Sequence, residues 1–224
     1  MRSVIERMAE LIPEAVIFEM ILTTVDAEGK PNAAPVGVTR KGSDLHIELA
    51  SGTRSLRNLR DSRMATLSIV YDARVFAKTA FNMTPADAFC TRRGWRVPVI
   101  AGAASSILVS LASHRATARK DELGRTVFHR LTLRPVQAVI PGLPRPHSRR
   151  FAAAIEVIIS VTRARVAAER GLHQPVAQIS RTVEEKLELA RRTGHDPETE
   201  EALQICVREL ASITNRVGRG QDVQ

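Results

Sequence analysis

The stretch TTVDAEGKPNAAPVGV, Thr23–Val38, decides the fold of the first half of the chain. It joins the strand pattern FEMILTT to a second strand, AAPVGVT, through DAEGKPN, where Gly29 and Pro31 supply turn chemistry, so it predicts a β-hairpin with a long loop. The second strand carries only small side chains at most positions from 33 to 37, where strands usually carry β-branched and aromatic residues. Such small side chains indicate that something flat or bulky approaches the backbone here.

Four more segments read as strands. DLHIELA and MATLSIV predict two of them, and SGTRSLRNLRDS between them predicts a short helix. The runs AASSILVSLASHRATAR and RTVFHRLTLRPVQAVI predict long strands, because Val, Ile, Leu and Thr are frequent and Pro135 would break a helix. A short amphipathic helix is expected to end near Pro13, and residues 82–100 are expected to form a loop.

The last third of the chain changes character. After PGLPRPHSRR, a linker rich in Pro and Arg, three segments with apolar stripes predict helices that end at Gly171, Gly194 and Gly218. The expected class is therefore α+β with a mainly β body. The expected domains are residues 1–142 for the β body and residues 149–218 for the helices.

The composition limits the partners. A net charge of +9 attracts anions, whether nucleic acid, acidic lipid or a phosphorylated small molecule. Nucleic acid is an unlikely partner, because the arginines are spread along the chain and only 4% of the residues are aromatic. No apolar run approaches the roughly 20 residues of a membrane span. The two cysteines are far apart in sequence, which favours the reducing cytoplasm over a disulfide framework.

The loop ASGTRSLRNLRDS is the strongest candidate for binding a phosphate. The hydroxyls of Thr53 and Ser55, the N–H groups of a helix start, and Arg54, Arg57 and Asn58 would together satisfy a dianion. A capped surface helix with solvated arginines is the alternative, and it stays open.

No metal site and no catalytic side chain is predicted. The six histidines are scattered without metal-ligand spacing, and no glycine fingerprint of a Rossmann or P-loop site occurs. The group His195, Asp196 and Glu198 is better explained as a helix start, with Asp196 as the cap and Pro197 at the first position.

The segments EMILTTVDAEGKPNAAPVGV and SGTRSLRNLRDSRMATLSIVYDARVFAKTAF resemble the FMN-binding split β-barrel proteins related to flavin reductases. The chain is most similar to a branch known mainly as a domain of unknown function, and the similarity extends to SRRFAAAIEVIISVTRARV. In that last segment an Arg, a Glu and a Thr-Arg pair recur in the branch, and they match Arg150, Glu156, Thr162 and Arg163. The resemblance implies a six-stranded split β-barrel with a C-terminal helical extension, which forms a homodimer and holds FMN near the subunit interface.

The resemblance also implies a set of cofactor-binding residues. Four lie by the flavin ring or its ribityl chain and four line the phosphate, while two match an Asp-x-x-x-Phe element after the next strand. In that order they are Asn32, Ala34, Pro35 and Gly37; Thr53, Ser55, Arg57 and Asn58; and Asp72 and Phe76.

Two functions follow from the resemblance. The first is a flavin-dependent oxidoreductase that acts on a small organic substrate and is linked to pterin-dependent one-carbon metabolism; the flavin performs the electron transfer. The alternative is a non-catalytic split-barrel dimer, a binding or scaffold protein that has lost tight flavin binding. Leu56 in place of an aromatic residue and Ser68 in place of an Asn favour the alternative.

Overall fold

The structure, a computed structural model, describes residues 4–14, 17–121, 124–141, 149–192 and 197–219. These residues form two compact units. Of the described residues, the barrel unit contains those up to Tyr71, Thr84–Arg119 and residues 125–141. The helical unit contains Asp72–Met83, Lys120–Gly124 and the C-terminal segment.

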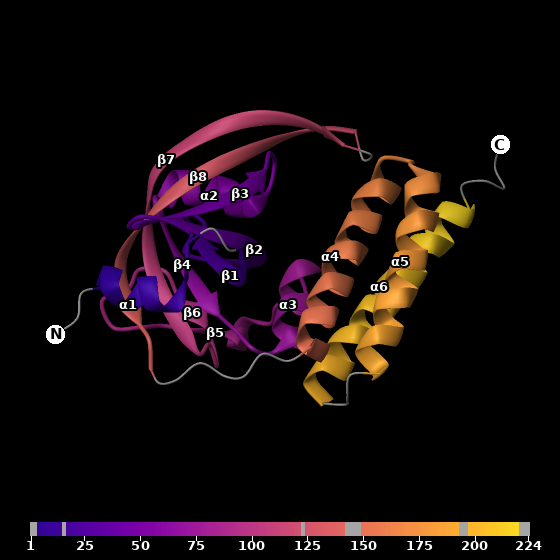
Figure 1. The fold of residues 1–224 in the computed structure, drawn as a ribbon. Helices are drawn as coiled ribbons and strands as arrows, with labels where there is room; N and C mark the ends of the chain where they lie inside the picture. The colour runs from indigo at the N-terminus through magenta and orange to yellow at the C-terminus, as the bar shows by residue number, and fades with distance from the viewer. Residues whose placement is uncertain (1–3, 15–16, 122–123, 142–148, 193–196, 220–224) are drawn as a thin grey trace. The chain divides into compact units, whose positions relative to one another are not determined.

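Six strands of the described chain close into a barrel in the order β1-β2-β3-β8-β7-β4 (Figure 1). The six-stranded barrel expected from the resemblance is therefore confirmed. Helices α1 (Val4–Leu11) and α2 (Arg54–Ser62) belong to the same unit. The strands are β1 (Phe18–Val25), β2 (Pro31–Lys41), β3 (Asp44–Ala50), β4 (Met64–Ile69), β7 (Ser105–Asp121) and β8 (Gly124–Val139).

The predicted hairpin is confirmed. Strand β1 pairs with β2 along its whole length, from Phe18 opposite Val38 to Val25 opposite Pro31. Strand β3 pairs only with the last part of β2, from Val38 onward. The first half of β2 therefore has no β3 partner, so the missing N–H of Pro35 costs no hydrogen bond on that side.

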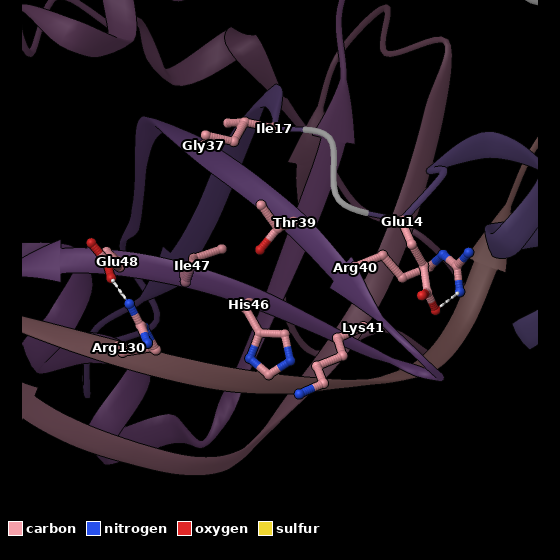
Figure 2. A pocket seen from close by; sticks show the side chains of 10 residues that line it. All are labelled: Glu14, Ile17, Gly37, Thr39, Arg40, Lys41, His46, Ile47, Glu48 and Arg130. Carbon is pink, nitrogen blue, oxygen red and sulfur yellow. Dashed lines mark hydrogen bonds and ion pairs between the residues drawn. The ribbon is translucent and has the colours of Figure 1, made fainter.

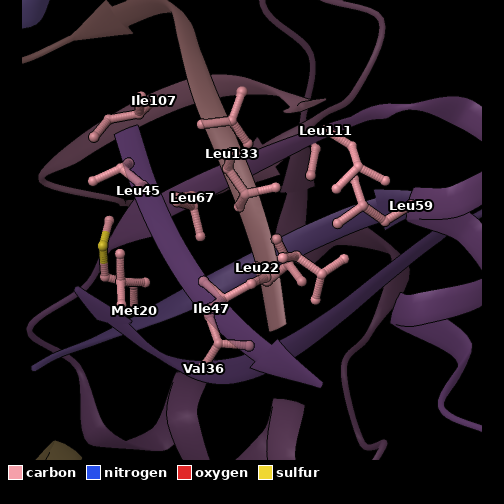
Figure 3. Close-up of a cluster of buried hydrophobic side chains, with 14 of the residues drawn as sticks. Met20, Leu22, Val36, Leu45, Ile47, Leu59, Leu67, Ile107, Leu111 and Leu133 are labelled. Atoms are coloured by element: carbon pink, nitrogen blue, oxygen red, sulfur yellow. The ribbon is translucent and has the colours of Figure 1, made fainter. Parts of the chain in front are cut away.

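The barrel interior is a continuous apolar core to which α2 contributes (Figure 3). Leu56 and Leu59, three residues apart on α2, join side chains from all six strands in this core. Burying a leucine of this kind contributes about 1.5–3 kcal/mol. The two leucines therefore fix the position of α2, and with it the loop that precedes the helix.

The helical unit contains α3 (Ala73–Ala80), α4 (Arg149–Glu169), α5 (His173–Arg192) and α6 (Pro197–Arg219). Helix α3 packs against α4 and α6, and the Phe76 ring meets the Phe151 ring edge-on, with centroids 5.9 Å apart. Arg150 is buried on α4, where it donates to the Ala190 carbonyl at 2.7 Å and to the Glu200 carboxylate at 2.5 Å. The three predicted C-terminal helices are confirmed.

Some local predictions differ from the structure. The expected loop at 82–100 contains a 3₁₀ turn, η1 (Ala86–Ala88), and a small sheet of β5 (Phe89–Cys90) and β6 (Val99–Ile100). The predicted end of α4 at Gly171 is confirmed by its positive φ of 69°. The predicted end at Gly218 is wrong, because α6 continues to Arg219; a helix tolerates an interior Gly at about 1 kcal/mol. Gly194, His195 and Asp196 lie outside the described residues.

The described helices include none that combines the length and the apolar character needed to cross a membrane.

Candidate functional site

The start of α2 presents free hydrogen-bond donors. Thr53 is the N-cap: its Oγ1 accepts from the Leu56 N–H at 3.4 Å and donates to the Ala50 carbonyl at 2.9 Å. The N–H groups of Arg54 and Ser55 find no acceptor in the described part of the chain, as is usual for the first turn of a helix. Gly52, with φ of 84°, has open space where a side chain would stand. Backbone donors therefore surround an open position.

The charge at this helix start is also unusual. The first turn of α2 contains no acidic residue, and the side chains of Arg54 and Arg57 are exposed there. Cations at the positive end of a helix dipole are unfavourable, whereas an anion at that end is stabilised. Free N–H groups and two arginines fit a phosphate group, which supports the site expected from the sequence.

Buried hydrogen bonds hold the helix start against the hairpin. Asn32, which is 8% exposed, donates through Nδ2 to Ser55 Oγ at 2.9 Å, and Arg54 donates to Asn32 Oδ1 at 3.3 Å. Asn58 donates through Nδ2 to Thr24 Oγ1 at 3.3 Å. The structure therefore brings Asn32, Thr53, Ser55 and Asn58 together. The side chains of Ser55 and Asn58 are buried, so the accessible donors at this end are backbone N–H groups and arginines.

Four residues of β2 were expected to lie by the flavin ring or its ribityl chain, and the structure does not place them on one face of the strand. They are Asn32, Ala34, Pro35 and Gly37. Side chains alternate along a strand, and Val36 lies in the core, so Asn32 and Ala34 share the interior side with it. Pro35 and Gly37 belong to the outer side. A Cβ added to Gly37 would lie 3.1 Å from Ile17 Cγ2, so part of the room beside this glycine is taken by Ile17. Flavin contacts of the four residues stay a prediction.

Asp72 and Phe76 lie in the helical unit. Asp72 caps α3: its Oδ1 accepts from the Arg74 N–H at 2.8 Å, and its Oδ2 accepts from the Arg74 guanidinium at 2.7 Å. This hydrogen bond to Asp72 raises the pKa of Arg74 above its ordinary value. Phe76 is 1% exposed and packs on Phe151. Both side chains therefore have structural partners, and their contact with a cofactor stays a prediction.

Leu56 and Ser68, which differ from the residues of the resembling proteins, are also buried. Leu56 is part of the barrel core, and Ser68 faces Ser106, with their hydroxyl oxygens 3.5 Å apart. Neither side chain is open to solvent.

Sequence reasoning missed Thr24 and Ser51 as neighbours of the helix start. Ser51 Oγ lies 3.0 Å from His129 Nε2, and the Ser51 N–H donates to the Val127 carbonyl at 2.8 Å. The alternation that places Met20 and Leu22 inside the barrel also places Thr24 there, so a signal for Thr24 existed. The contact of Ser51 with β8 had no local signal.

Over the described ranges, no group of three or more His, Cys, Asp or Glu side chains is arranged to hold a metal ion. Cys90 is exposed, and Cys206 is buried.

The six-stranded barrel followed by C-terminal helices defines a split-barrel protein. Residues 18–141 match the family described as protein of unknown function (DUF447) N-terminal domain, and the chain belongs to this family.

Solved structures share the fold. An FMN-bound protein of the DUF447 family from Methanosarcina mazei has a TM-score of 0.67 at 22% identity, and the match covers 88% of this chain and 96% of that one. A putative flavin reductase with a split barrel domain from Shewanella frigidimarina has a TM-score of 0.45 at 12% identity, covering 62% and 75%. The styrene monooxygenase flavin reductase from Pseudomonas putida has a TM-score of 0.44 at 18% identity, covering 58% and 93%.

Proposed function

We propose that this protein binds FMN, with the phosphate at the start of α2, and acts as a flavin-dependent oxidoreductase on a small organic substrate. One observation carries the proposal: the first turn of α2 combines unpaired N–H groups and two exposed arginines with no acidic residue. The FMN-bound relative from Methanosarcina mazei, which shares the barrel and the helices, supports FMN as the ligand.

The chain itself would bind and orient the cofactor. The N–H groups of Arg54 and Ser55 and the guanidinium of Arg57 would hold the phosphate. The hydrogen bond between Asn32 and Ser55 keeps the helix start in place against β2. Bound FMN supplies hydride or electron transfer, so no side chain is assigned as an acid or base.

Three finer elements complete this proposal. They are a homodimer, a cytoplasmic location and a link to pterin-dependent one-carbon metabolism. The homodimer and the pterin link rest on the resemblance alone, and the cytoplasmic location rests on the two cysteines that lie far apart in sequence.

The phosphate site can be tested by comparing FMN with riboflavin, which lacks the phosphate. The variant Arg57→Ala should lose roughly 1.5–3 kcal/mol of FMN affinity, because this is what a charge-assisted hydrogen bond contributes. Its riboflavin affinity should stay unchanged. Arg60→Ala is the matched control, since Arg60 is exposed in the last turn of the same helix. Equal FMN affinity in all three proteins would place the phosphate elsewhere.

The alternative function is a non-catalytic split-barrel dimer that binds or scaffolds a partner without tight flavin binding. The burial of Leu56 and Ser68 favours it, because neither side chain is open to a ligand. Titration of the wild-type protein with FMN decides between the two functions. Saturable binding, followed by reduction of the flavin by a nicotinamide cofactor, supports the oxidoreductase; absence of saturable binding supports the alternative.

A further inference from the structure

A groove of about 770 Å³ lies on the outer side of the barrel, over β2, β3 and β8 (Figure 2). This volume falls in the range of roughly 300–1,000 Å³ typical of small-molecule sites. Thr39 of β2 and His46 of β3 are paired neighbours across the strands, and both line the groove. All lining residues belong to the barrel unit.

One end of the groove holds hydrogen-bond donors with unused capacity. Arg40 is fixed there, because its Nε donates to the Ile12 carbonyl at 2.6 Å and its Nη1 donates to Glu14 at 3.0 Å and to the Gly42 carbonyl at 2.7 Å. Its Nη2 group has no acceptor among the residues that the structure describes. A guanidinium that is already held in place loses little conformational freedom when it binds an anion.

Two further donors of the groove, Lys41 and His46, lie on the outer face of β2 and β3. The Lys41 ammonium is exposed and has no partner in the described segments. His46 Nδ1 lies 3.4 Å from Thr132 Oγ1, and its Nε2 has no partner there either. Figure 2 shows the His46 ring and the Lys41 ammonium side by side, while the Arg40 guanidinium turns toward Glu14. Unused donors therefore gather around one part of the groove.

The acidic side chains of the groove are already neutralised. Glu48 accepts from Arg119 at 2.7 Å and from Arg130 at 2.9 Å. Burial alone would raise the pKa of Glu48, but these hydrogen bonds outweigh it and lower the pKa. Glu14 accepts from Arg40 and from the Gly42 N–H. Neither carboxylate therefore cancels the attraction of an anion to Lys41 and His46.

The opposite side of the groove is apolar. Ile17 is 69% exposed there, and Gly37 leaves the floor beside it without a side chain. An apolar group that covers Ile17 would remove its side chain from water, which is favourable by roughly 25 cal/mol per Å². The groove thus offers a cationic end and an apolar side.

We propose that this groove binds a small organic anion, with its carboxylate at Lys41 and His46 and its apolar body against Ile17 and Gly37. The site differs from the helix start. Gly37 lies five residues from Asn32 along β2, about 16 Å at roughly 3.3 Å per residue, on the opposite face of the strand. The inference therefore does not depend on FMN binding. If the protein also binds FMN, the groove would hold the organic substrate.

Benzoate is the probe, and amide chemical shifts of the full-length protein are the readout. Saturable shifts are expected at Gly37, Lys41 and His46. Lys41→Gln should weaken benzoate binding about tenfold, as expected when one charge-assisted contact is lost. Lys30→Gln is the matched control, because it removes one exposed lysine from the turn between β1 and β2 and should leave binding unchanged.

Several outcomes would overturn the proposal. Shifts that do not saturate, or equal weakening by the two lysine variants, would mean general attraction to a basic protein. If inorganic phosphate binds and benzoate does not, the ligand of the groove has no apolar part. FMN that displaces benzoate would make the groove part of the flavin site. Benzoate binding in a protein that ignores FMN would instead support the groove while refuting the proposed flavin function.

Discussion

Replacing Arg57 with Gln is expected to stabilise the protein without ligand while weakening its binding of FMN. The Arg57 side chain is exposed near the start of α2 and makes no hydrogen bond or ion pair within the described residues, so its replacement breaks no such interaction. The first turn carries no acidic residue to balance it. Relief of the unfavourable interaction with the helix dipole should raise the free energy of unfolding by about 0.3–1 kcal/mol at low ionic strength.

The FMN affinity should change in the opposite direction. Loss of a charge-assisted hydrogen bond to the phosphate costs about 1.5–3 kcal/mol, which corresponds to a decrease of roughly 10- to 150-fold in affinity. Riboflavin binding should not change. A misfolded variant would lose both stability and affinity, so opposite signs identify the electrostatic cause.

Urea unfolding followed by circular dichroism gives the stability, and flavin fluorescence gives the affinity. Arg60→Gln is the control: a cation in the last turn is favourable, so this variant should lose stability and keep FMN binding. Added salt should shrink both stability changes, because the charges are exposed. If Arg57→Gln and Arg60→Gln change the stability in the same direction, the argument from the helix start fails.

Three other predictions concern the rest of the chain. Glu200→Gln should lower the free energy of unfolding by about 1–2 kcal/mol in urea, because it replaces a charge-assisted hydrogen bond from the buried Arg150 guanidinium with a neutral one. Burial raises the pKa of Cys206 to about 12, so a thiol reagent at pH 8 should modify only Cys90 in the native protein and both thiols after denaturation. The lowered pKa of Glu48 contributes stability that is present above its ordinary value of 4.5 and lost as the pH falls through the lowered value. Glu48→Gln should therefore flatten the acid limb of a plot of stability against pH.

The sequence predicted those parts of the fold that have strong local signals. The hairpin followed from its turn residues, and the long strands β7 and β8 followed from β-branched content and Pro135. Helix α3 was missed because its eight residues carry no long periodic pattern, and it is held by α4 and α6 far along the chain. Strands β5 and β6 were missed because two residues are too few to show alternation.

The candidate sites show the same division. Thr53 was predicted near a helix start, and its capping hydrogen bond confirms that position. Burial of Ser55 and Asn58 could not be predicted, because it depends on how deeply Leu56 and Leu59 draw α2 into the barrel. The donors of the groove gather only when β2 and β3 pair, so the order of residues alone does not reveal them.

The membership of α3 in the helical unit has a consequence during protein synthesis. Helix α3 leaves the ribosome about 70 residues before α4 begins. At roughly 5–20 residues per second, its apolar side, with Phe76, waits about 4–14 s for its first partner, Phe151, to be translated. A nascent chain that ends before Phe151 therefore lacks the ring that packs on Phe76, and chaperones that recognise apolar segments would meet α3 at that stage.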